Sequence, residues 1–135
     1  MSNTLNTSSE NQKKTKLGIV GSREFPNLHL VDVLLLKLSK DEYEIVSGGA
    51  LGVDIYAEEQ ARALGFDCVI FYPNKALGKR GFLERNSQIV GYSDLVVAFY
   101  DGKSTGTLDS MKKAVAAGKL RKVFKEFDEE STISL

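Results

Sequence analysis

The feature that most constrains the fold of this chain is the alternation of short apolar runs with longer segments of helical periodicity. Three of the apolar runs, LGIV, DCVIF and LVVAF, are almost continuously hydrophobic. Strands that helices cover on both faces have this composition, because neither face meets water. Between the runs, apolar residues recur at helical spacing, as Val53, Ala57, Ala61 and Leu64 do before Gly65 ends the pattern. This alternation predicts βαβ units and a parallel sheet.

The pattern predicts an α/β fold, a single-domain Rossmann-like three-layer sandwich with a mostly parallel five-stranded sheet. Residues 16–127 hold this domain, and the polar segments 1–15 and 128–135 are interpreted as disordered tails. The sequence predicts strands in 16–22, 43–49, 66–73, 94–102 and 121–127, and helices in 27–40, 53–64, 83–93 and 105–119.

Charge and composition limit the possible partners. Lysines and arginines number 18, as do aspartates and glutamates, so the formal net charge is zero. This balance argues against nucleic acid and membranes as partners, because both attract a strongly basic surface. The single Cys68 excludes an intramolecular disulfide and a cysteine-based zinc site. No apolar run reaches the ~18 residues of a membrane span, so we expect a cytoplasmic protein. We also expect neither a bound metal nor a resident cofactor.

Glycines and hydroxyl residues follow three of the predicted strands. Ligands of open parallel sheets bind outside the carboxyl ends of the strands, and anions settle where glycines expose the amides of a helix N-terminus. The three loops therefore predict a phosphate- or ribose-binding site. The alternative is that the glycines only form tight turns and that the hydroxyls only cap helices. The candidates from the loops are Gly21, Ser22, Arg23, Ser47, Gly48, Gly49, Asp54, Asp101, Ser104, Thr105, Gly106 and Thr107.

The loops fit neither of the two common nucleotide signatures. The Walker pattern ends in Gly-Lys-Ser/Thr, whereas Lys103 precedes its glycine, and GIVGSRE lacks the third glycine of the dinucleotide fingerprint. The motifs GIVGSREF, IVSGGALGVD, LERN and DLVVAFYDGKSTGT, taken together, resemble the SLOG superfamily, the Rossmann-like domains related to Smf/DprA and the LOG proteins. The resemblance covers about residues 16–124 and is strongest to the small YspA-like branch.

The resemblance implies binding of nucleotides or nucleotide-derived ligands. Some relatives, the LOG enzymes, hydrolyse nucleoside 5′-monophosphates, others sense signalling nucleotides, and the DprA branch binds single-stranded DNA. Arg85 keeps the LOG arginine, nine positions before Asp94, but Ser110 stands where the LOG pattern has its catalytic Glu. The neighbouring Asp109 is turned by about 100° along a helix. This substitution argues against an enzyme; a hydrolase would have to use Arg85 with Asp109, Asp101 or Asp54.

The remaining candidates each allow two interpretations. Arg85 and Asn86 are expected to open the third helix, where Arg85 could clamp a phosphate or simply be solvated. Asp54 could bind ribose hydroxyls or complement the dipole of its helix. The basic segment 74–85 could fold over a polyphosphate as a lid or form a solvated face. Tyr72 and Tyr100 could stack a base or pack at the sheet edge.

We therefore expect a protein that binds a nucleotide or an ADP-ribose-like ligand at the carboxyl edge of the sheet, as a sensor or a sequestering protein. Two alternatives remain open: a LOG-like nucleoside 5′-monophosphate phosphoribohydrolase, and single-stranded DNA binding of the DprA kind. By analogy with relatives, a homo-oligomer such as a dimer is expected.

Overall fold

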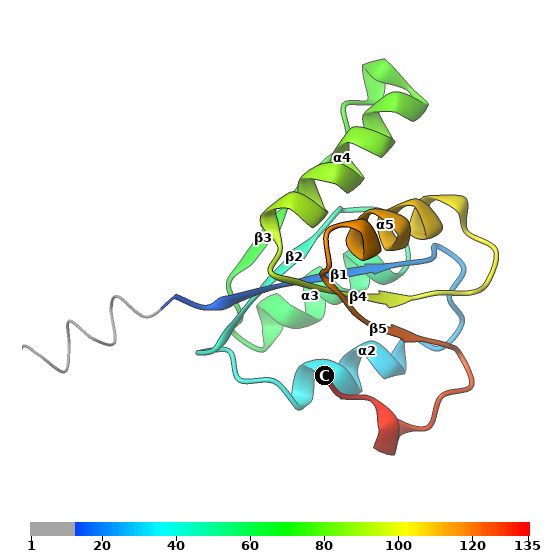
Figure 1. Cartoon of the computed structure of the whole chain (residues 1–135). Coiled ribbons are helices and arrows are strands. Elements are labelled where there is room, and N and C mark those ends of the chain that lie inside the picture. The colour runs from blue at the N-terminus through cyan, green and yellow to red at the C-terminus, as the bar shows by residue number, and fades with distance from the viewer. Residues whose placement is uncertain (1–12) are drawn as a thin grey trace, which may run out of the picture.

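Five parallel strands form one sheet in the computed structural model, which describes residues 13–135 (Figure 1). They run in the order β3-β2-β1-β4-β5, and every neighbouring pair is parallel. The order reverses between β1 and β4, which is where open α/β sheets bind ligands. The predicted α/β class is confirmed. The strands are β1 (Thr15–Gly21), β2 (Tyr43–Ser47), β3 (Cys68–Ile70), β4 (Leu95–Phe99) and β5 (Leu120–Phe124).

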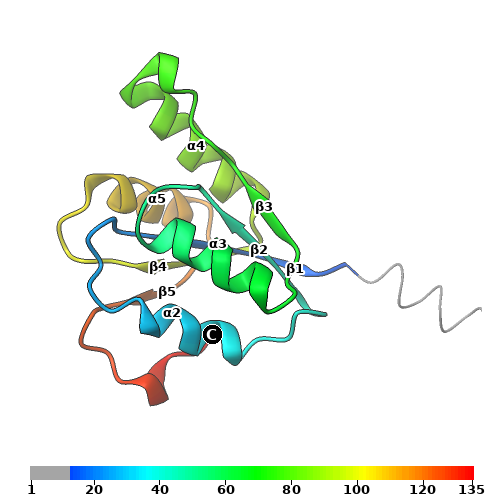
Figure 2. The same cartoon turned by 180° about the vertical axis from the view of Figure 1, so that it is seen from behind.

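Four helices cover the sheet and complete the three layers. The helices α2 (His29–Leu36) and α3 (Val53–Ala63) lie on one face, and α4 (Lys79–Tyr92) and α5 (Thr105–Ala116) lie on the other (Figures 1 and 2). Within residues 13–135, none of the helices combines the length and the hydropathy needed to cross a membrane. The first 12 residues of the predicted N-terminal tail lie outside the described part of the chain.

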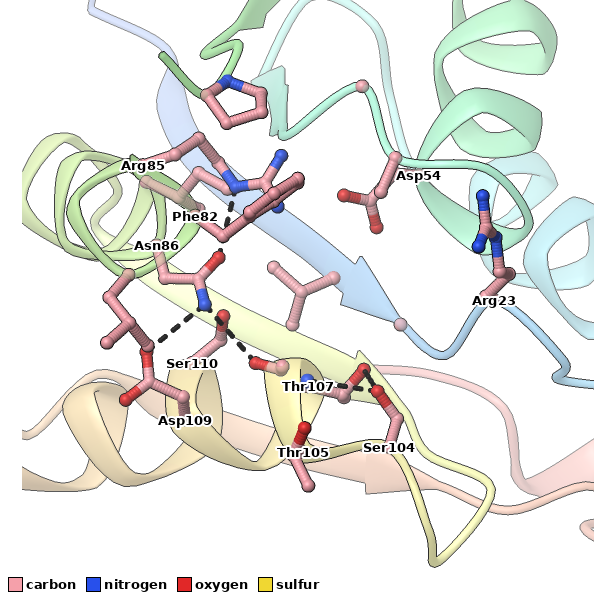
Figure 3. Close-up of a pocket in the computed structure, with 18 of the residues that line it drawn as sticks. Arg23, Asp54, Phe82, Arg85, Asn86, Ser104, Thr105, Thr107, Asp109 and Ser110 are labelled. Carbon is pink, nitrogen blue, oxygen red and sulfur yellow. Dashed lines mark hydrogen bonds between the residues drawn. The ribbon is translucent and has the colours of Figure 1, made fainter. Parts of the chain in front are cut away.

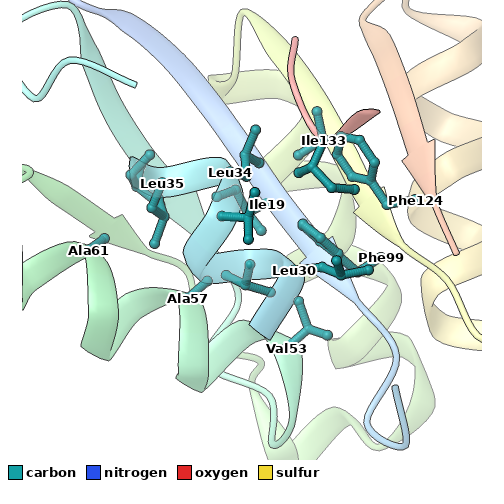
Figure 4. Packing of buried hydrophobic residues seen from close by; sticks show 14 of the residues in the cluster. Ile19, Leu30, Leu34, Leu35, Val53, Ala57, Ala61, Phe99, Phe124 and Ile133 are labelled. Carbon is teal, nitrogen blue, oxygen red and sulfur yellow. The ribbon is translucent and has the colours of Figure 1, made fainter. Parts of the chain in front are cut away.

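Each face of the sheet has its own apolar core. Leu17 and Ile19 of β1 pack with Leu30, Val53 and Ala57 of α2 and α3 (Figure 4). On the other face, a smaller cluster joins β-strand residues to Ile89 of α4 and Ala114 of α5. Both faces of β1 are buried, as the continuous apolar run predicts. The exposed Leu64 is an exception to the predicted core pattern of α3, because the helix has already ended at Ala63.

Helix α4 begins four residues earlier than the predicted start at residue 83. A short 3₁₀ turn, η1 (Lys75–Leu77), precedes it, and the side chain of Asn74 caps this turn by accepting a hydrogen bond from the Ala76 amide. Gly78, with φ +59°, then redirects the chain into α4. The basic segment is therefore largely helical and is not a lid loop. Arg85 and Asn86 lie in the second turn of α4 and do not open it, which corrects their predicted position.

The C-terminal residues also differ from their interpretation as a disordered tail. A second 3₁₀ turn, η2 (Glu130–Thr132), leads to Ile133, whose side chain is fully buried in the larger core. The ammonium group of Lys37 donates to the carbonyl oxygens of Glu130 (3.1 Å) and Ile133 (2.7 Å). One apolar residue and one lysine thus anchor a segment whose composition is otherwise polar.

Candidate functional site

A cavity of about 1420 Å³ opens at the carboxyl end of β1, at the point where the strand order reverses. Val20 and Gly21 of β1 form part of its lining, and α3, α4 and α5 supply the walls. Figure 3 shows side chains from the three helices facing this space. The cavity therefore lies where the topology of the sheet places ligand sites in open α/β folds.

The structure brings most of the predicted site residues to this cavity. Ten of the fourteen line it, and they come from all three glycine-containing loops and from α4. The ten are Gly21, Arg23, Gly49, Asp54, Arg85, Asn86, Ser104, Thr105, Gly106 and Thr107. Ser22, Ser47, Gly48 and Asp101 are not among the lining residues.

Three of the residues outside the lining hold the loops in place. The hydroxyl of Ser47 donates to the carbonyl oxygen of Ile19 in the neighbouring strand (2.7 Å). The hydroxyl of Ser22 accepts from the amide of Asp101 (3.1 Å) and donates to the hydroxyl of Thr107 (3.4 Å). These bonds tie the loops after β1, β2 and β4 to the sheet and to one another.

Asp101 shapes the loop before α5. It lines a separate, smaller depression, together with Arg23 and Lys103. Its carboxylate accepts from the amides of Lys103 (2.8 Å) and Ser104 (2.9 Å). Partial burial raises the pKa of Asp101, but these hydrogen bonds outweigh it and hold the pKa below its usual value. The carboxylate is therefore ionised and occupied by its own loop.

A polar network across α4 and α5 fixes Arg85 and Asn86. The guanidinium of Arg85 donates to the carbonyl oxygen of Gly48 and to the side-chain oxygen of Asn86 (3.0 Å). Asn86 in turn donates to the carbonyl oxygen of Gly106 (3.3 Å) and to Asp109 (3.1 Å) (Figure 3). Both α4 side chains are buried. They are therefore held in place before any ligand arrives.

Asp109 takes part in the same network. Its Oδ2 atom also accepts from Lys113, one turn further along α5, at 2.7 Å. Ser110, which stands in the position of the LOG glutamate, is buried on the cavity lining. Asp109, the carboxylate next in sequence to the position of the LOG glutamate, is thus already hydrogen-bonded to the side chains of Asn86 and Lys113.

Asp54, in the first turn of α3, has an unusual environment. Only 4% of the residue is exposed, and its Oδ1 atom has no hydrogen-bond partner among the described residues. Burial raises the pKa of Asp54 to about 7, although the positive charge of Arg85 opposes this rise. Burial likewise lowers the pKa of Arg85. A buried acceptor without a partner calls for an explanation in terms of water, an ion or a ligand.

The N-terminus of α5 forms the opposite wall. Ser104 caps the helix, because its hydroxyl accepts from the amide of Thr107 (3.2 Å). The first amides of an α-helix have no intrahelical acceptor, so those of Thr105 and Gly106 are available to a bound anion. Glycine at position 106 leaves open space around its Cα.

Several lining residues were missed by the sequence reasoning. They include Phe82, Lys112 and Leu51. Tyr72, a predicted candidate for stacking a base, is 66% exposed and also lines the cavity. Tyr100 is not part of the lining. The helical spacing of Phe82, Arg85 and Ile89 is the signal that would have added Phe82, had α4 been given its full length.

The charge on the cavity wall is strongly positive, in contrast to the neutral chain. Five cationic side chains line the cavity against two acidic ones, Asp54 and Asp109. The five are Arg23, Lys75, Lys79, Arg85 and Lys112. A cavity of this charge attracts phosphate groups even though the net charge of the whole protein is zero.

Comparisons with known proteins relate the chain to DNA-processing proteins. A family model described as DNA recombination-mediator protein A matches residues 6–76. No curated protein matches the chain. Among solved structures, DNA processing protein A from Helicobacter pylori is 28% identical, with a TM-score of 0.65 over 85% of this chain and 67% of that one. The DprA structure from Streptococcus pneumoniae is 23% identical, with a TM-score of 0.69 over 83% of this chain and 50% of that one.

A third structure, the structural-genomics target TM1055, is 25% identical, with a TM-score of 0.62 over 78% of this chain and 72% of that one. The chain thus spans two thirds of the H. pylori protein and half of the S. pneumoniae protein. The resemblance to the SLOG superfamily is confirmed, while the YspA-like branch stays a prediction.

One prediction has to be corrected. The neutral net charge argued against nucleic acid as a partner, but the H. pylori structure is described by its single-stranded DNA binding mode. The argument failed because net charge averages over the whole surface, whereas the cations gather on one cavity.

The family model matches more than half of the residues of this chain, and the chain therefore belongs to the DNA recombination-mediator protein A family.

Proposed function

We propose that this protein binds a nucleotide in the cavity at the carboxyl end of β1, and that it acts as a sensor or a sequestering protein for that nucleotide. The observation that carries the proposal is the excess of cationic over acidic side chains on a cavity that also holds the N-terminus of α5. Backbone amides, hydroxyls and fixed cations together suit a phosphate group.

The phosphate and the base of a nucleotide would contact different parts of the cavity lining. The phosphate would lie at the amides of Thr105 and Gly106, where Thr105 supplies a hydroxyl as well. Tyr72 and Phe82 are exposed aromatic side chains on the lining, and they can stack against the flat face of a base. Phe82 also lies beneath the guanidinium of Arg85, with 5.8 Å between the ring centroid and Cζ.

The direct test is to denature freshly purified protein after native mass spectrometry and to identify any released small molecule. Isothermal titration with the nucleoside 5′-monophosphates then measures affinity. We expect Phe82→Ala to weaken binding several-fold without a loss of stability, because this residue is 43% exposed. Leu36→Ala, which truncates an exposed residue on α2, is the matched control. Undetectable binding of all nucleotides would refute the proposal.

Single-stranded DNA is the second candidate ligand, and the family match favours it. The same aromatic side chains and cations would then stack bases and neutralise phosphates along a strand. Fluorescence anisotropy with an oligo(dT) probe at several salt concentrations tests this function. If DNA is the ligand, log K should fall linearly with log salt, and Lys79→Ala should reduce the slope by about one. If only mononucleotides bind, the DNA function is excluded.

A further inference from the structure

Asp54 and Arg85 flank the same point of the cavity wall without forming an ion pair. A Cβ atom built on Gly48 would lie 2.7 Å from Nη1 of Arg85 and 2.9 Å from Oδ2 of Asp54. No ion pair joins these two side chains among those found in residues 13–135. The donor and the acceptor are therefore too far apart to bond directly, but close enough for a single bridging atom.

Both of these side chains are buried. Arg85 is held by the carbonyl oxygen of Gly48 and by Asn86, which is itself bonded to α5. Asp54 projects from the first turn of α3 toward the space beside Arg85 (Figure 3). Its buried Oδ1 atom has no hydrogen-bond partner among the described residues, which is a second sign that this carboxyl group is open to a bond from a ligand.

The charges and the hydrogen-bonding groups of Asp54 and Arg85 determine which ligand group can bridge the two side chains. A phosphate would accept from Arg85 but would meet a carboxyl group that repels it when ionised. An ammonium group would suit Asp54 but would be repelled by the guanidinium. A hydroxyl group donates one hydrogen bond and accepts another through a single oxygen atom, and it carries no charge. It is the group that satisfies both neighbours.

We propose that Asp54 and Arg85 form a subsite for a sugar hydroxyl, so that the cavity prefers a ribonucleotide over its deoxy counterpart. This inference rests on the proposed nucleotide-binding function. The subsite lies across the cavity from Ser104 and Thr105 at the α5 N-terminus (Figure 3), so one nucleotide presents its phosphate and its sugar to different walls. The 2′-hydroxyl also distinguishes RNA from DNA, so the subsite separates the two candidate ligands.

The experiment is isothermal titration of the full chain with the four ribonucleoside 5′-monophosphates and their 2′-deoxy and 3′-deoxy counterparts. In the wild-type protein, we expect removal of one hydroxyl to weaken binding about tenfold or more, because it leaves buried polar groups unpaired. In Asp54→Ala, the ribo and deoxy forms should bind equally well. Asp32→Asn is the matched control, because this carboxylate bonds to Tyr56 away from the cavity and should leave the preference intact.

The outcomes separate the two proposals. If no nucleotide binds to the wild-type protein, the proposed function fails and the hydroxyl subsite fails with it. If ribo and deoxy forms bind equally to the wild type, or if Asp54→Ala keeps the preference, the hydroxyl subsite is overturned while the nucleotide-binding function stands. If Asp54→Ala does not fold, the comparison of ribo and deoxy forms on the wild-type protein alone decides whether the hydroxyl subsite exists.

Discussion

At the scale of single residues, Gly48 is a position beside the site with no room for a side chain. Its φ is not left-handed, so space rather than backbone conformation requires glycine here. A methyl group would come within 3.0 Å of Arg85, Asp54 and Ile89. We expect Gly48→Ala to fold, because two of these contacts are the ends of flexible side chains. Nucleotide affinity, measured by titration calorimetry, should fall at least about tenfold, since the Arg85 guanidinium is displaced.

The control for this change is Gly91→Ala in the last turn of α4, where no atom lies within 4 Å of the new methyl group. This variant should keep its affinity and gain up to about 0.5 kcal/mol in stability, since alanine favours a helix over glycine. Equal affinities of the two variants would show that the position of Arg85 does not matter for binding.

Asp54 makes stability depend on pH in a way that an ordinary surface aspartate does not. Its pKa is about 7 in the folded protein and 3.8 in the unfolded chain, so the folded state holds the extra proton between these values. The free energy of unfolding therefore decreases as pH rises through this window and levels off above it. At ~1.4 kcal/mol per pKa unit, and with the group half ionised at pH 7, this group contributes a decrease of roughly 2 kcal/mol from pH 5 to pH 7.

Asp54→Asn removes this titration and leaves the other groups in place. Urea unfolding at pH 5, 7 and 8 should show the variant gaining stability relative to the wild type as pH rises, with most of the gain between pH 5 and pH 7 and only a small further gain up to pH 8. The Asp32→Asn protein, which loses a partly exposed carboxylate away from the cavity, is measured in parallel as the control. A stability difference between wild type and Asp54→Asn that is independent of pH would mean that Asp54 stays ionised in the fold.

At the scale of elements, the N-terminus of α5 combines a structural and a binding role that substitutions can separate. Ser104→Ala removes the cap, so the free energy of unfolding should fall by about 1 kcal/mol. Ser104→Asp keeps a capping oxygen and should stay near wild-type stability, yet its negative charge should weaken phosphate binding about tenfold or more. Thermal unfolding and nucleotide titration of both variants measure the two effects.

Loss of binding in Ser104→Ala together with unchanged binding in Ser104→Asp would contradict this division, because binding would then depend on the capping oxygen that serine and aspartate share and would be insensitive to the added negative charge. Thr107, whose amide and hydroxyl both bond to Ser104, would then be the next residue to test.

Helices α3 and α4 show why element boundaries were predictable in one case and not in the other. In α3, Val53, Ala57 and Ala61 recur at helical spacing and are all buried, so the pattern alone identifies the helix. In α4, Gly78 and Gly81 look like loop residues. Gly81 is instead required inside the helix, because a Cβ there would come within 2.1 Å of the Asn74 carbonyl oxygen. Such a tertiary contact leaves no local signal.

At the scale of the whole molecule, the parallel sheet made much of the candidate site predictable. Strand ends of a parallel sheet share one edge, so glycine loops far apart in sequence meet there, as Gly21, Gly49 and Gly106 do. The side chain of Lys112 could not be assigned to the cavity, because its direction depends on how α5 lies on the sheet. The packing of the helices on the sheet also brings cations together around one cavity of a protein whose net charge is zero.

The C-terminal segment closes the larger core, and its role is testable at this scale. Ile133 is fully buried and points toward Phe124 (Figure 4), so truncation to alanine leaves a cavity in the core between α2 and β5. We expect Ile133→Ala to lower the free energy of unfolding by about 2–3 kcal/mol, within the range for buried isoleucine. Urea unfolding monitored by circular dichroism measures this change, and the exposed Leu36→Ala should shift stability by less than about 0.5 kcal/mol.

This prediction also distinguishes folding from binding, because Ile133 lies on the sheet face covered by α2 and α3 and is not among the residues that line the cavity. Ile133→Ala should therefore keep the nucleotide affinity of the wild type at temperatures where it remains folded. Wild-type stability in Ile133→Ala would show that the last residues contribute nothing to the core. A loss of affinity without a loss of stability would instead show that the two faces of the sheet are coupled through β1.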